Sequence, residues 1–327
     1  MTVRTRLIAA VAAALVLVST PFWPASAEGP TLGGVAVSGL HNSYEKGAFG
    51  HFTDALSTGV GMVELDVWTT LSSWTVNHDH PFWNDNNCTS AGGDTSQSLG
   101  TCVDNIKSWH DANPTHQPLL IKLELKAGFQ DDQGVGPDEL DALFADRLGP
   151  AMYRPADLMG GAHATPDAAS RADAWAPAES LRGRVILMVL KGTVENDSLP
   201  TEVEYARHLS ANPGTAVAFP FVHDGIAGSD PRTRYEEALR PWFVVFDGGA
   251  KTFAGLSPEQ RAFYVDNHYL TVATNVNELP PELDATNPTP AEATERLRQV
   301  GCLGASVASS DWYQVPDWHQ TVPRGGC

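Results

Sequence analysis

Residues 61–67 read Gly-Met-Val-Glu-Leu-Asp-Val, an apolar segment with two carboxylates at its centre. Its apolar residues alternate with Glu64 and Asp66, and side chains in an extended strand alternate between its two faces. The segment therefore predicts a strand that places both carboxylates on one face. Two neighbouring anions are unfavourable unless a cation lies between them, and a hard divalent metal is the best candidate. A half-exposed edge strand with a polar outer face is the alternative.

Apolar runs that end in polar residues recur along the chain. Candidate strands cover residues 35–40, 62–67, 74–77, 119–125, 185–190, 216–222, 242–246, 269–274 and 306–309, and candidate helices cover 51–56, 103–112, 138–148, 258–265 and 291–300. Strands that alternate with helices indicate a parallel sheet. No Gly-x-Gly-x-x-Gly fingerprint follows any strand, and the polar residues gather at strand carboxyl ends. The pattern predicts an α/β fold, a single (β/α)8 TIM-type barrel, rather than a doubly wound sheet.

The N-terminus has the pattern of a secretory signal peptide. Two arginines precede an apolar run over residues 7–18, and Ala25-Ser26-Ala27 places small residues at the expected cleavage positions. We expect residues 1–27 to be removed and residues 28–327 to form one exported catalytic domain. The run is shorter than the roughly 20 apolar residues of a membrane helix, and no later segment approaches that length.

Four cysteines in an exported chain predict two disulfides. We prefer Cys88 with Cys102 and Cys302 with Cys327, because each partner is the nearest in sequence, although four cysteines allow three pairings. No Cys-x-x-Cys spacing occurs, which argues against a zinc site.

The chain is strongly acidic. Its formal net charge is −18, and removal of residues 1–27, which hold two arginines and no acid, leaves −20. Such a surface repels polyanions, so nucleic acid is disfavoured as a partner. Docking on strongly anionic membranes is also opposed, unless calcium bridges the two surfaces or the contact is mainly apolar.

A barrel would gather six polar side chains at the carboxyl ends of its first strands: His41, Asn42, Glu64, Asp66, His78 and Glu124. Four of them offer oxygen and none offers sulfur, which suits Ca²⁺ bound by Asn42, Glu64, Asp66 and Glu124. Magnesium fits less well, because it usually uses one or two protein carboxylates. The two histidines are then free to act as acid and base, although His41 alone could simply bond to backbone.

Four segments resemble, in order and spacing, the X-box half of phosphoinositide-specific phospholipase C: Leu40–Tyr44, Val63–Val67, Val76–Asp79 and Pro118–Glu124. The resemblance covers residues 35–126 and is strongest to the secreted, calcium-dependent actinobacterial type. It implies that His41 and His78 are catalytic and that Asn42, Glu64, Asp66 and Glu124 bind calcium. It also implies phosphatidylinositol at a membrane surface as the substrate. We expect the protein to be a monomer.

The resemblance thins beyond residue 126. The segment Arg184–Gly192 is similar to the family strand whose lysine contacts the inositol phosphate, so Lys191 is expected to bind substrate, together with Lys126 and Asp311. Thr193 stands where many eukaryotic members carry a second lysine, and their Ser-Arg-x-Tyr-Pro segment is absent. These departures favour plain phosphatidylinositol over highly phosphorylated inositol lipids.

The resemblance implies a phospholipase C reaction, classed as a phosphoric diester hydrolase or phosphorus-oxygen lyase. The inositol 2-hydroxyl attacks phosphorus, diacylglycerol leaves and a cyclic inositol phosphate forms. We assign His78 as the acid that protonates the leaving group, and we prefer it to His80 because Pro81 ends the strand. His41 stabilises phosphate oxygens or shares the role of base with Glu64. Phe82 and Trp83 are expected to form a membrane-facing rim, or else to cap the barrel core.

Two other functions remain open at this stage. A glycerophosphodiesterase-like enzyme also pairs two histidines with a divalent metal, but such enzymes usually open with His-Arg-Gly, whereas this chain has His41-Asn42-Ser43. A secreted binding protein could keep the barrel without turnover, and the presence of all six polar residues argues against it.

Overall fold

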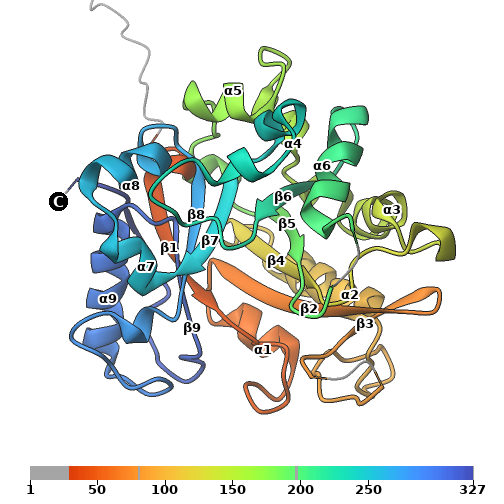
Figure 1. The fold of residues 1–327 in the computed structure, drawn as a ribbon. Helices are drawn as coiled ribbons and strands as arrows, with labels where there is room; N and C mark the ends of the chain where they lie inside the picture. Colours follow the sequence, from red (N-terminus) through yellow and green to blue (C-terminus); the bar gives the residue numbers. More distant parts are fainter. Residues whose placement is uncertain (1–28, 80–81, 196–197, 327) are drawn as a thin grey trace, which may run out of the picture.

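The computed structural model describes residues 29–79, 82–195 and 198–326. Within these ranges, eight parallel strands form a closed barrel surrounded by helices (Figure 1). The barrel closes because β1 pairs with both β9 and β2. The predicted (β/α)8 barrel is confirmed. Its strands, in order around the barrel, are β1 (Val35–Leu40), β2 (Met62–Thr70), β4 (Leu119–Leu125), β5 (Val185–Lys191), β6 (Ala218–Val222), β7 (Val245–Gly249), β8 (Leu270–Thr274) and β9 (Val307–Ser310).

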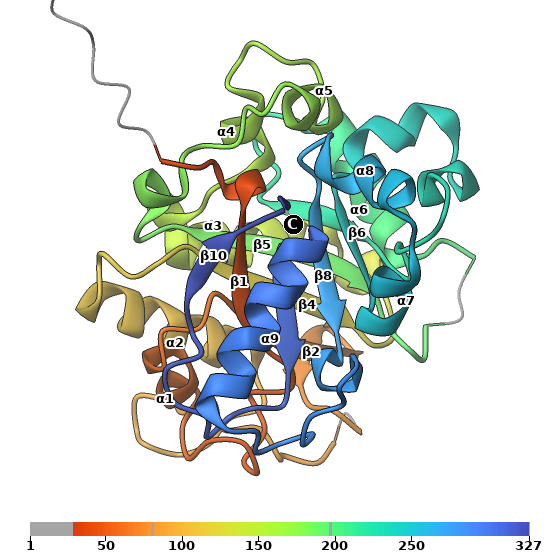
Figure 2. The same ribbon diagram turned by 90° about the vertical axis from the view of Figure 1, so that its left-hand side faces the viewer.

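Helices cover the outside of the barrel, and the long α9 lies across β1 and β9 (Figure 2). The link from β6 to β7 holds only the 3-10 turns η5 (Pro231–Arg234) and η6 (Glu237–Trp242). No helix in the described ranges is long and apolar enough to cross a membrane. The α-helices are α1 (Phe52–Ser57), α2 (Leu99–Ala112), α3 (Pro137–Leu148), α4 (Pro155–Met159), α5 (Pro166–Arg171), α6 (Thr201–Ala211), α7 (Ala250–Gly255), α8 (Pro258–Val265) and α9 (Pro290–Leu303).

Two further strands lie outside the barrel. The candidate strand 74–77 corresponds to β3 (Ser73–Val76), which pairs antiparallel with the far end of β2 as a hairpin. The expectation that it forms one of the first strands of the barrel was therefore wrong. On the other side, β10 (Thr321–Pro323) pairs antiparallel with β1.

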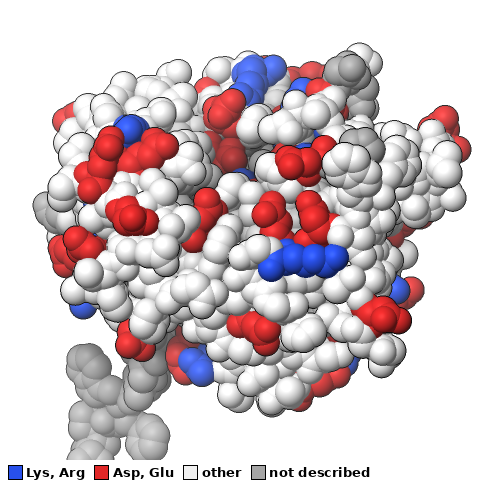
Figure 3. All heavy atoms as spheres, turned by 90° about the horizontal axis from the view of Figure 1, so that it is seen from below, with Lys and Arg blue, Asp and Glu red and all other residues white. Residues whose placement is uncertain are grey.

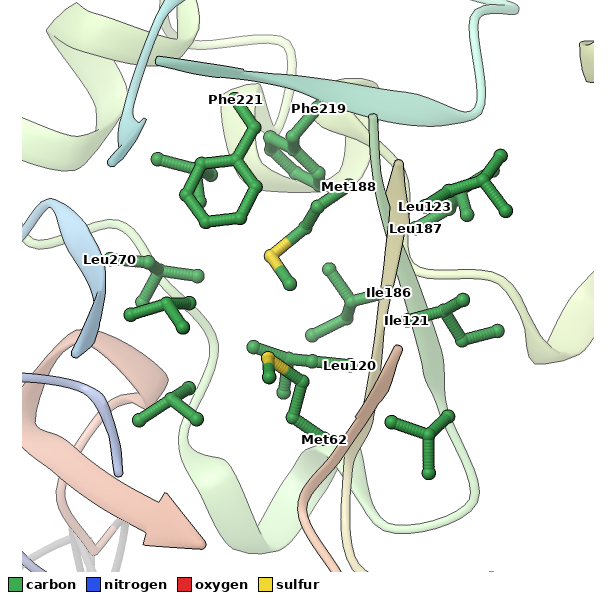
Figure 4. Packing of buried hydrophobic residues seen from close by; sticks show 14 of the residues in the cluster. Met62, Leu120, Ile121, Leu123, Ile186, Leu187, Met188, Phe219, Phe221 and Leu270 are labelled. Carbon is green, nitrogen blue, oxygen red and sulfur yellow. The ribbon is translucent and has the colours of Figure 1, made fainter. Parts of the chain in front are cut away.

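The barrel interior follows the alternation predicted for residues 61–67. Met62 lies opposite Leu120, Glu64 opposite Lys122 and Asp66 opposite Glu124. Figure 4 shows Met62 and Leu120 pointing into the barrel, together with side chains of β5, β6 and β8, while Leu123 lies on the other side of the sheet. The interior is thus apolar at the start of β2 and β4 and becomes charged towards their carboxyl ends.

The predicted disulfide between Cys88 and Cys102 is present. It closes a loop that holds the end of β3, because the Val76 N–H donates to the Gln97 carbonyl at 2.7 Å. Just before the loop, Asn86 Nδ2 donates to the Val76 carbonyl at 2.8 Å. Cys327 lies outside the described residues, as does the predicted signal peptide. The pairing of Cys302 with Cys327 therefore stays a prediction.

A partly buried histidine outside the barrel predicts acid sensitivity. His319 Nδ1 lies 2.8 Å from Ser38 Oγ, and burial lowers the pKa of His319 from 6.5 to about 4. The unfolded chain takes up this proton below pH 6.5 whereas the folded protein resists until about pH 4. Stability is therefore lost as the pH falls through this window, by up to about 3 kcal/mol.

The free energy of unfolding of the His319→Gln variant should fall less between pH 7 and pH 4 than that of the wild type. Urea titrations at each pH measure this. His163→Gln, in the α4–α5 connection, is the control and should keep the wild-type slope. Equal slopes for His319→Gln and wild type would contradict the assignment.

Candidate active site

Three carboxylates meet at the end of the barrel where its strands terminate. Glu64 and Asp66 come from β2 and Glu124 comes from β4, and one oxygen of each lies within 4.8 Å of the others. Glu64 and Asp66 are only 2 % exposed. Figure 3 views this end of the molecule and shows acidic side chains around a hollow. The predicted gathering of these three acids is therefore present.

Two buried lysines of β4 and its carboxyl end neutralise part of this charge. Lys122 Nζ lies 2.8 Å from Glu64 Oε1 and 3.7 Å from Asp247 Oδ2. Lys126 Nζ lies 2.8 Å from both Asp66 Oδ2 and Glu124 Oε1. Lys126 was predicted to bind substrate, but here it contacts the carboxylates themselves.

The carboxylates still have unsatisfied oxygens. Glu64 Oε2 and Asp66 Oδ1 are buried and accept no hydrogen bond from the described residues. A buried carboxylate oxygen without a partner is costly, and a hard cation satisfies it. The residues therefore fit a calcium ion: the ligand atoms are oxygens, two of them accept no hydrogen bond, and three carboxylates converge.

Asn42, the fourth predicted ligand, follows β1 in the left-handed conformation, with φ of 49°. Asparagine tolerates this conformation better than most residues. The buried Tyr44 hydroxyl lies 3.4 Å from Asn42 Oδ1. Burial and the charges of Asp66 and Glu64 raise the pKa of Tyr44 well above its ordinary value, so Tyr44 stays a neutral donor between Asn42 and the carboxylates.

His41 lies beside the three carboxylates and is held in place by a fourth acid, Asp311. Nδ1 is 2.8 Å from Asp311 Oδ1, and Nε2 is 3.5 Å from Glu64 Oε2. Because a carboxylate only accepts, Nδ1 carries a proton. Burial alone would lower the pKa of His41, but Glu64 and Asp311 outweigh it and raise the pKa to about 9.

His78 flanks the cluster next to Asp66. Its Nε2 lies 3.9 Å from Asp66 Oδ2, and its Nδ1 lies 2.7 Å from Asp79 Oδ1. The ring is partly exposed, as a group that meets substrate must be. His80, the rival candidate, and Pro81 lie outside the described residues.

The loop after β5 completes the edge of the site. A Cβ on Gly192 would come within 2.3 Å of the Leu125 carbonyl oxygen, so only glycine permits this close approach to the end of β4. The approach lets the Thr193 N–H donate to Glu124 Oε1 at 3.1 Å. Lys191, at the end of β5, is half-buried, and no acidic side chain among the described residues forms an ion pair with it. Its expected role in substrate binding stays a prediction.

The pKa values of the two β2 acids, Glu64 and Asp66, are shifted in opposite directions. Burial raises the pKa of Asp66, and the neighbouring Glu64 and Glu124 raise it further, against the opposing effect of Lys126. Burial also opposes ionisation of Glu64, but Lys122 and His41 outweigh it and lower the pKa of Glu64. Of the two acids, Glu64 is therefore the one that stays ionised at neutral pH.

The structure adds residues that the sequence reading missed. Lys122 pairs with Glu64, Tyr44 lies between Asn42 and the acids, and Asp247 of β7 lies across the barrel from Glu64. Lys122 could have been found from alternation, because it shares a face with Glu124 in the apolar strand β4.

Comparison with solved structures identifies the family. The calcium-dependent phosphatidylinositol-specific phospholipase C of Streptomyces antibioticus is 42% identical to this chain, with a TM-score of 0.86, over 91% of this chain and 100% of that one. The chain belongs to the calcium-dependent phosphatidylinositol-specific phospholipase C family. The resemblance seen in the four sequence motifs is therefore confirmed.

More distant phospholipases C share the fold. A calcium-dependent phosphoinositol-specific phospholipase C of a Pseudomonas species, solved with myoinositol, has a TM-score of 0.69 at 19% identity, over 90% of this chain and 96% of that one. A second crystal form of the Pseudomonas enzyme has a TM-score of 0.68 at 20% identity, over 92% of this chain and 97% of that one. No protein-family model and no curated protein matches the chain.

Proposed function

We propose that this protein cleaves phosphatidylinositol in a calcium-dependent phospholipase C reaction, giving diacylglycerol and a cyclic inositol phosphate. One observation carries the proposal: two histidines flank three converging carboxylates, in a chain 42% identical to the Streptomyces antibioticus enzyme. Calcium bound by Asn42, Glu64, Asp66 and Glu124 would neutralise the phosphate and lower the pKa of the inositol 2-hydroxyl.

His41 is suited to stabilise the phosphate. Its raised pKa keeps the ring protonated at neutral pH, and Asp311 fixes the ring so that Nε2 faces the cluster. A protonated imidazole cannot accept the 2-hydroxyl proton. Glu64 Oε2 accepts no hydrogen bond and lies 3.5 Å from His41 Nε2, so we assign Glu64 as the base. We assign Asp311 the positioning of His41 in place of the substrate contact expected from the sequence.

His78 is suited to protonate the departing glycerol oxygen. It lies on the other flank of the carboxylates, and its partly exposed ring is open to substrate. Asp79 Oδ1 accepts a hydrogen bond from Nδ1, which leaves Nε2 to deliver a proton towards the reacting centre. Acid catalysis of this kind contributes about 10²- to 10⁴-fold.

The lipid surface is expected to meet an apolar rim at the same end of the barrel. Among the described residues, the most exposed large hydrophobic side chains are Leu71, Phe82, Trp83 and Val194, at 83%, 72%, 71% and 50%. Leu71 is at the tip of the β2–β3 hairpin, Phe82 and Trp83 follow β3, and Val194 follows β5. All four belong to connections that leave the carboxyl ends of barrel strands, so the exposure favours a rim over a core cap.

Phe82→Ala combined with Trp83→Ala should reduce turnover of phosphatidylinositol in vesicles by about tenfold or more, because aromatic side chains favour the bilayer interface. Turnover of a short-chain soluble analogue should change little. Tyr313→Phe removes a hydroxyl that donates to Asp311 Oδ1 at 3.1 Å, and this control should not discriminate between the two substrates. Equal losses on both substrates by the double variant would refute the rim.

The place of action is proposed from two features. The residue 1–27 pattern predicts export, and the Cys88–Cys102 disulfide suits an oxidising exterior. We propose a secreted monomer that contacts membranes transiently.

One assay tests the reaction. The protein is incubated with labelled phosphatidylinositol, phosphatidylcholine and glycerophosphoinositol, in calcium, magnesium or chelator. The proposal expects diacylglycerol from phosphatidylinositol in calcium, a weaker rate in magnesium and none in chelator. Turnover of glycerophosphoinositol alone would indicate a glycerophosphodiesterase, and no turnover of any substrate would indicate a binding protein.

A further inference from the structure

The two buried lysines contact only some of the oxygens of the three carboxylates, and other oxygens of the same acids accept no hydrogen bond. The lysines contact Glu64 Oε1, Asp66 Oδ2 and Glu124 Oε1. The buried oxygens that accept no hydrogen bond are Glu64 Oε2, which lies 3.5 Å from His41 Nε2, and Asp66 Oδ1. Each β2 carboxylate therefore offers one oxygen to an ammonium group and keeps the other without a hydrogen bond. The lysines and a bound metal can be present together.

The two lysines differ in what else they contact. Lys122 lies 3.7 Å from Asp247, a fourth acid that offsets part of its charge. Lys126 forms ion pairs only with Asp66 and Glu124 among the described residues. Lys126 is 5% exposed, and its N–H donates to the Val67 carbonyl at 2.7 Å, which fixes its backbone against β2. Lys126 is thus a fixed, buried positive charge whose ion-pair partners among the described residues are themselves two of the predicted metal ligands.

Counting charges shows what Lys126 changes. Lys126 adds one positive charge beside the ligands Asp66 and Glu124, both before and after a divalent ion binds. Removal of Lys126 therefore makes the site one charge more negative in both states. A metal binds more tightly to the more negative site, whereas a phosphodiester anion is attracted more strongly to the more positive one.

We propose that Lys126 is a positioning residue that weakens calcium binding and leaves the loaded site one charge more positive for the phosphodiester. The inference rests on the proposed function and concerns how that function is tuned. It departs from the sequence expectation that Lys126 touches the substrate, because its ammonium group is engaged by two carboxylates. It also predicts an unusual direction of effect: removal of Lys126 strengthens metal binding and weakens catalysis.

Calorimetric titration of the metal-free protein with calcium alone tests the proposal. Lys126→Met should bind calcium at least about tenfold more tightly than the wild type, because a positive charge near the ion is gone. Lys126→Arg keeps the charge and should stay close to the wild type. Lys107→Met, which removes an exposed lysine paired with Asp111 on α2, is the matched control and should leave the affinity unchanged.

Thermal unfolding with and without calcium gives a second readout. The metal-free Lys126→Met protein should melt lower than the wild type, and calcium should raise its melting temperature by a larger amount. If Lys126→Met does not fold, Lys126→Gln removes the same charge, keeps a hydrogen-bond donor and should show the same tighter binding. In vesicle assays the KM of the folded variant for phosphatidylinositol should rise.

The outcomes separate this inference from the proposed function. Unchanged or weaker calcium binding by the neutral variants, with normal binding by the wild type, would overturn the role of Lys126 alone. A wild-type protein that binds no calcium would overturn the proposed function as well.

Discussion

Asp66→Asn is expected to reduce calcium-dependent turnover of phosphatidylinositol by about 10³-fold or more, while the metal-free protein stays folded. The variant removes a metal ligand at the centre of the site. It also removes one of three crowded negative charges, and Lys126 keeps its 2.8 Å contact with Glu124. Since its neighbours hold the pKa of Asp66 up, a neutral side chain at this position costs the metal-free protein little.

Glu64→Gln supplies the contrast. Its expected loss of activity is similar, but it leaves Lys122 with only Asp247 at 3.7 Å, and an uncompensated buried cation is destabilising. Denaturant titration of the metal-free variants should therefore find Glu64→Gln less stable than Asp66→Asn. Full activity of Asp66→Asn in calcium would contradict the metal assignment, and the reverse order of stabilities would contradict the pairing of the lysines.

His78→Ala is expected to slow cleavage of a substrate with an alkyl alcohol leaving group by about 10²- to 10⁴-fold. The same variant should retain far more activity on a nitrophenyl leaving group, because an anion of low pKa departs without a proton. The rates of the variant and the wild type are measured on both substrates at saturating calcium. The fold loss on the alkyl substrate, divided by the fold loss on the nitrophenyl substrate, should be well above one.

His80→Ala is the control, because it replaces the neighbouring histidine two residues along the chain. It should slow both substrates equally or not at all. A leaving-group dependence that appears with His80→Ala instead of His78→Ala would move the acid to His80.

Most of what could be predicted of this fold and site came from the alternation of apolar and polar side chains along the strands. The period of two in residues 61–67 placed Glu64 and Asp66 on the inner face, and the barrel put Glu124 beside Asp66 through the register of β2 and β4. What alternation on one strand cannot show is the neighbour across the sheet. The charge conflict between the two acids pointed to a metal, but the structure resolves part of it with Lys122 and Lys126.

Asp247 was missed for a different reason. The predicted strand 242–246 ended three residues too early, because aspartate and glycine are depleted in strands, yet β7 runs from Val245 to Gly249. Gly248 is required there, since a Cβ would lie 2.7 Å from a side-chain carbon of Ile226. Close packing at the barrel mouth therefore overrode the local preference.

The helices α6 and α7 were missed because their signals are short. Helix α7 spans only Ala250–Gly255, and α6 begins directly after Pro200 and carries few apolar residues. Packing against the sheet stabilises such helices more than their own propensity does. The hairpin strand β3 was taken for a barrel strand because pairing direction leaves no mark on a four-residue run.

The loop closed by Cys88 and Cys102 has a consequence for the acid His78. The Gln97 carbonyl of this loop accepts the Val76 N–H and so holds the end of β3 two residues before His78, whereas the barrel strands contain no cysteine. A reductant that opens the disulfide is therefore expected to loosen the support of His78 while the barrel stays closed. Inside the reducing interior of the cell that makes it, such a chain would be folded but poorly able to attack that cell's own lipids.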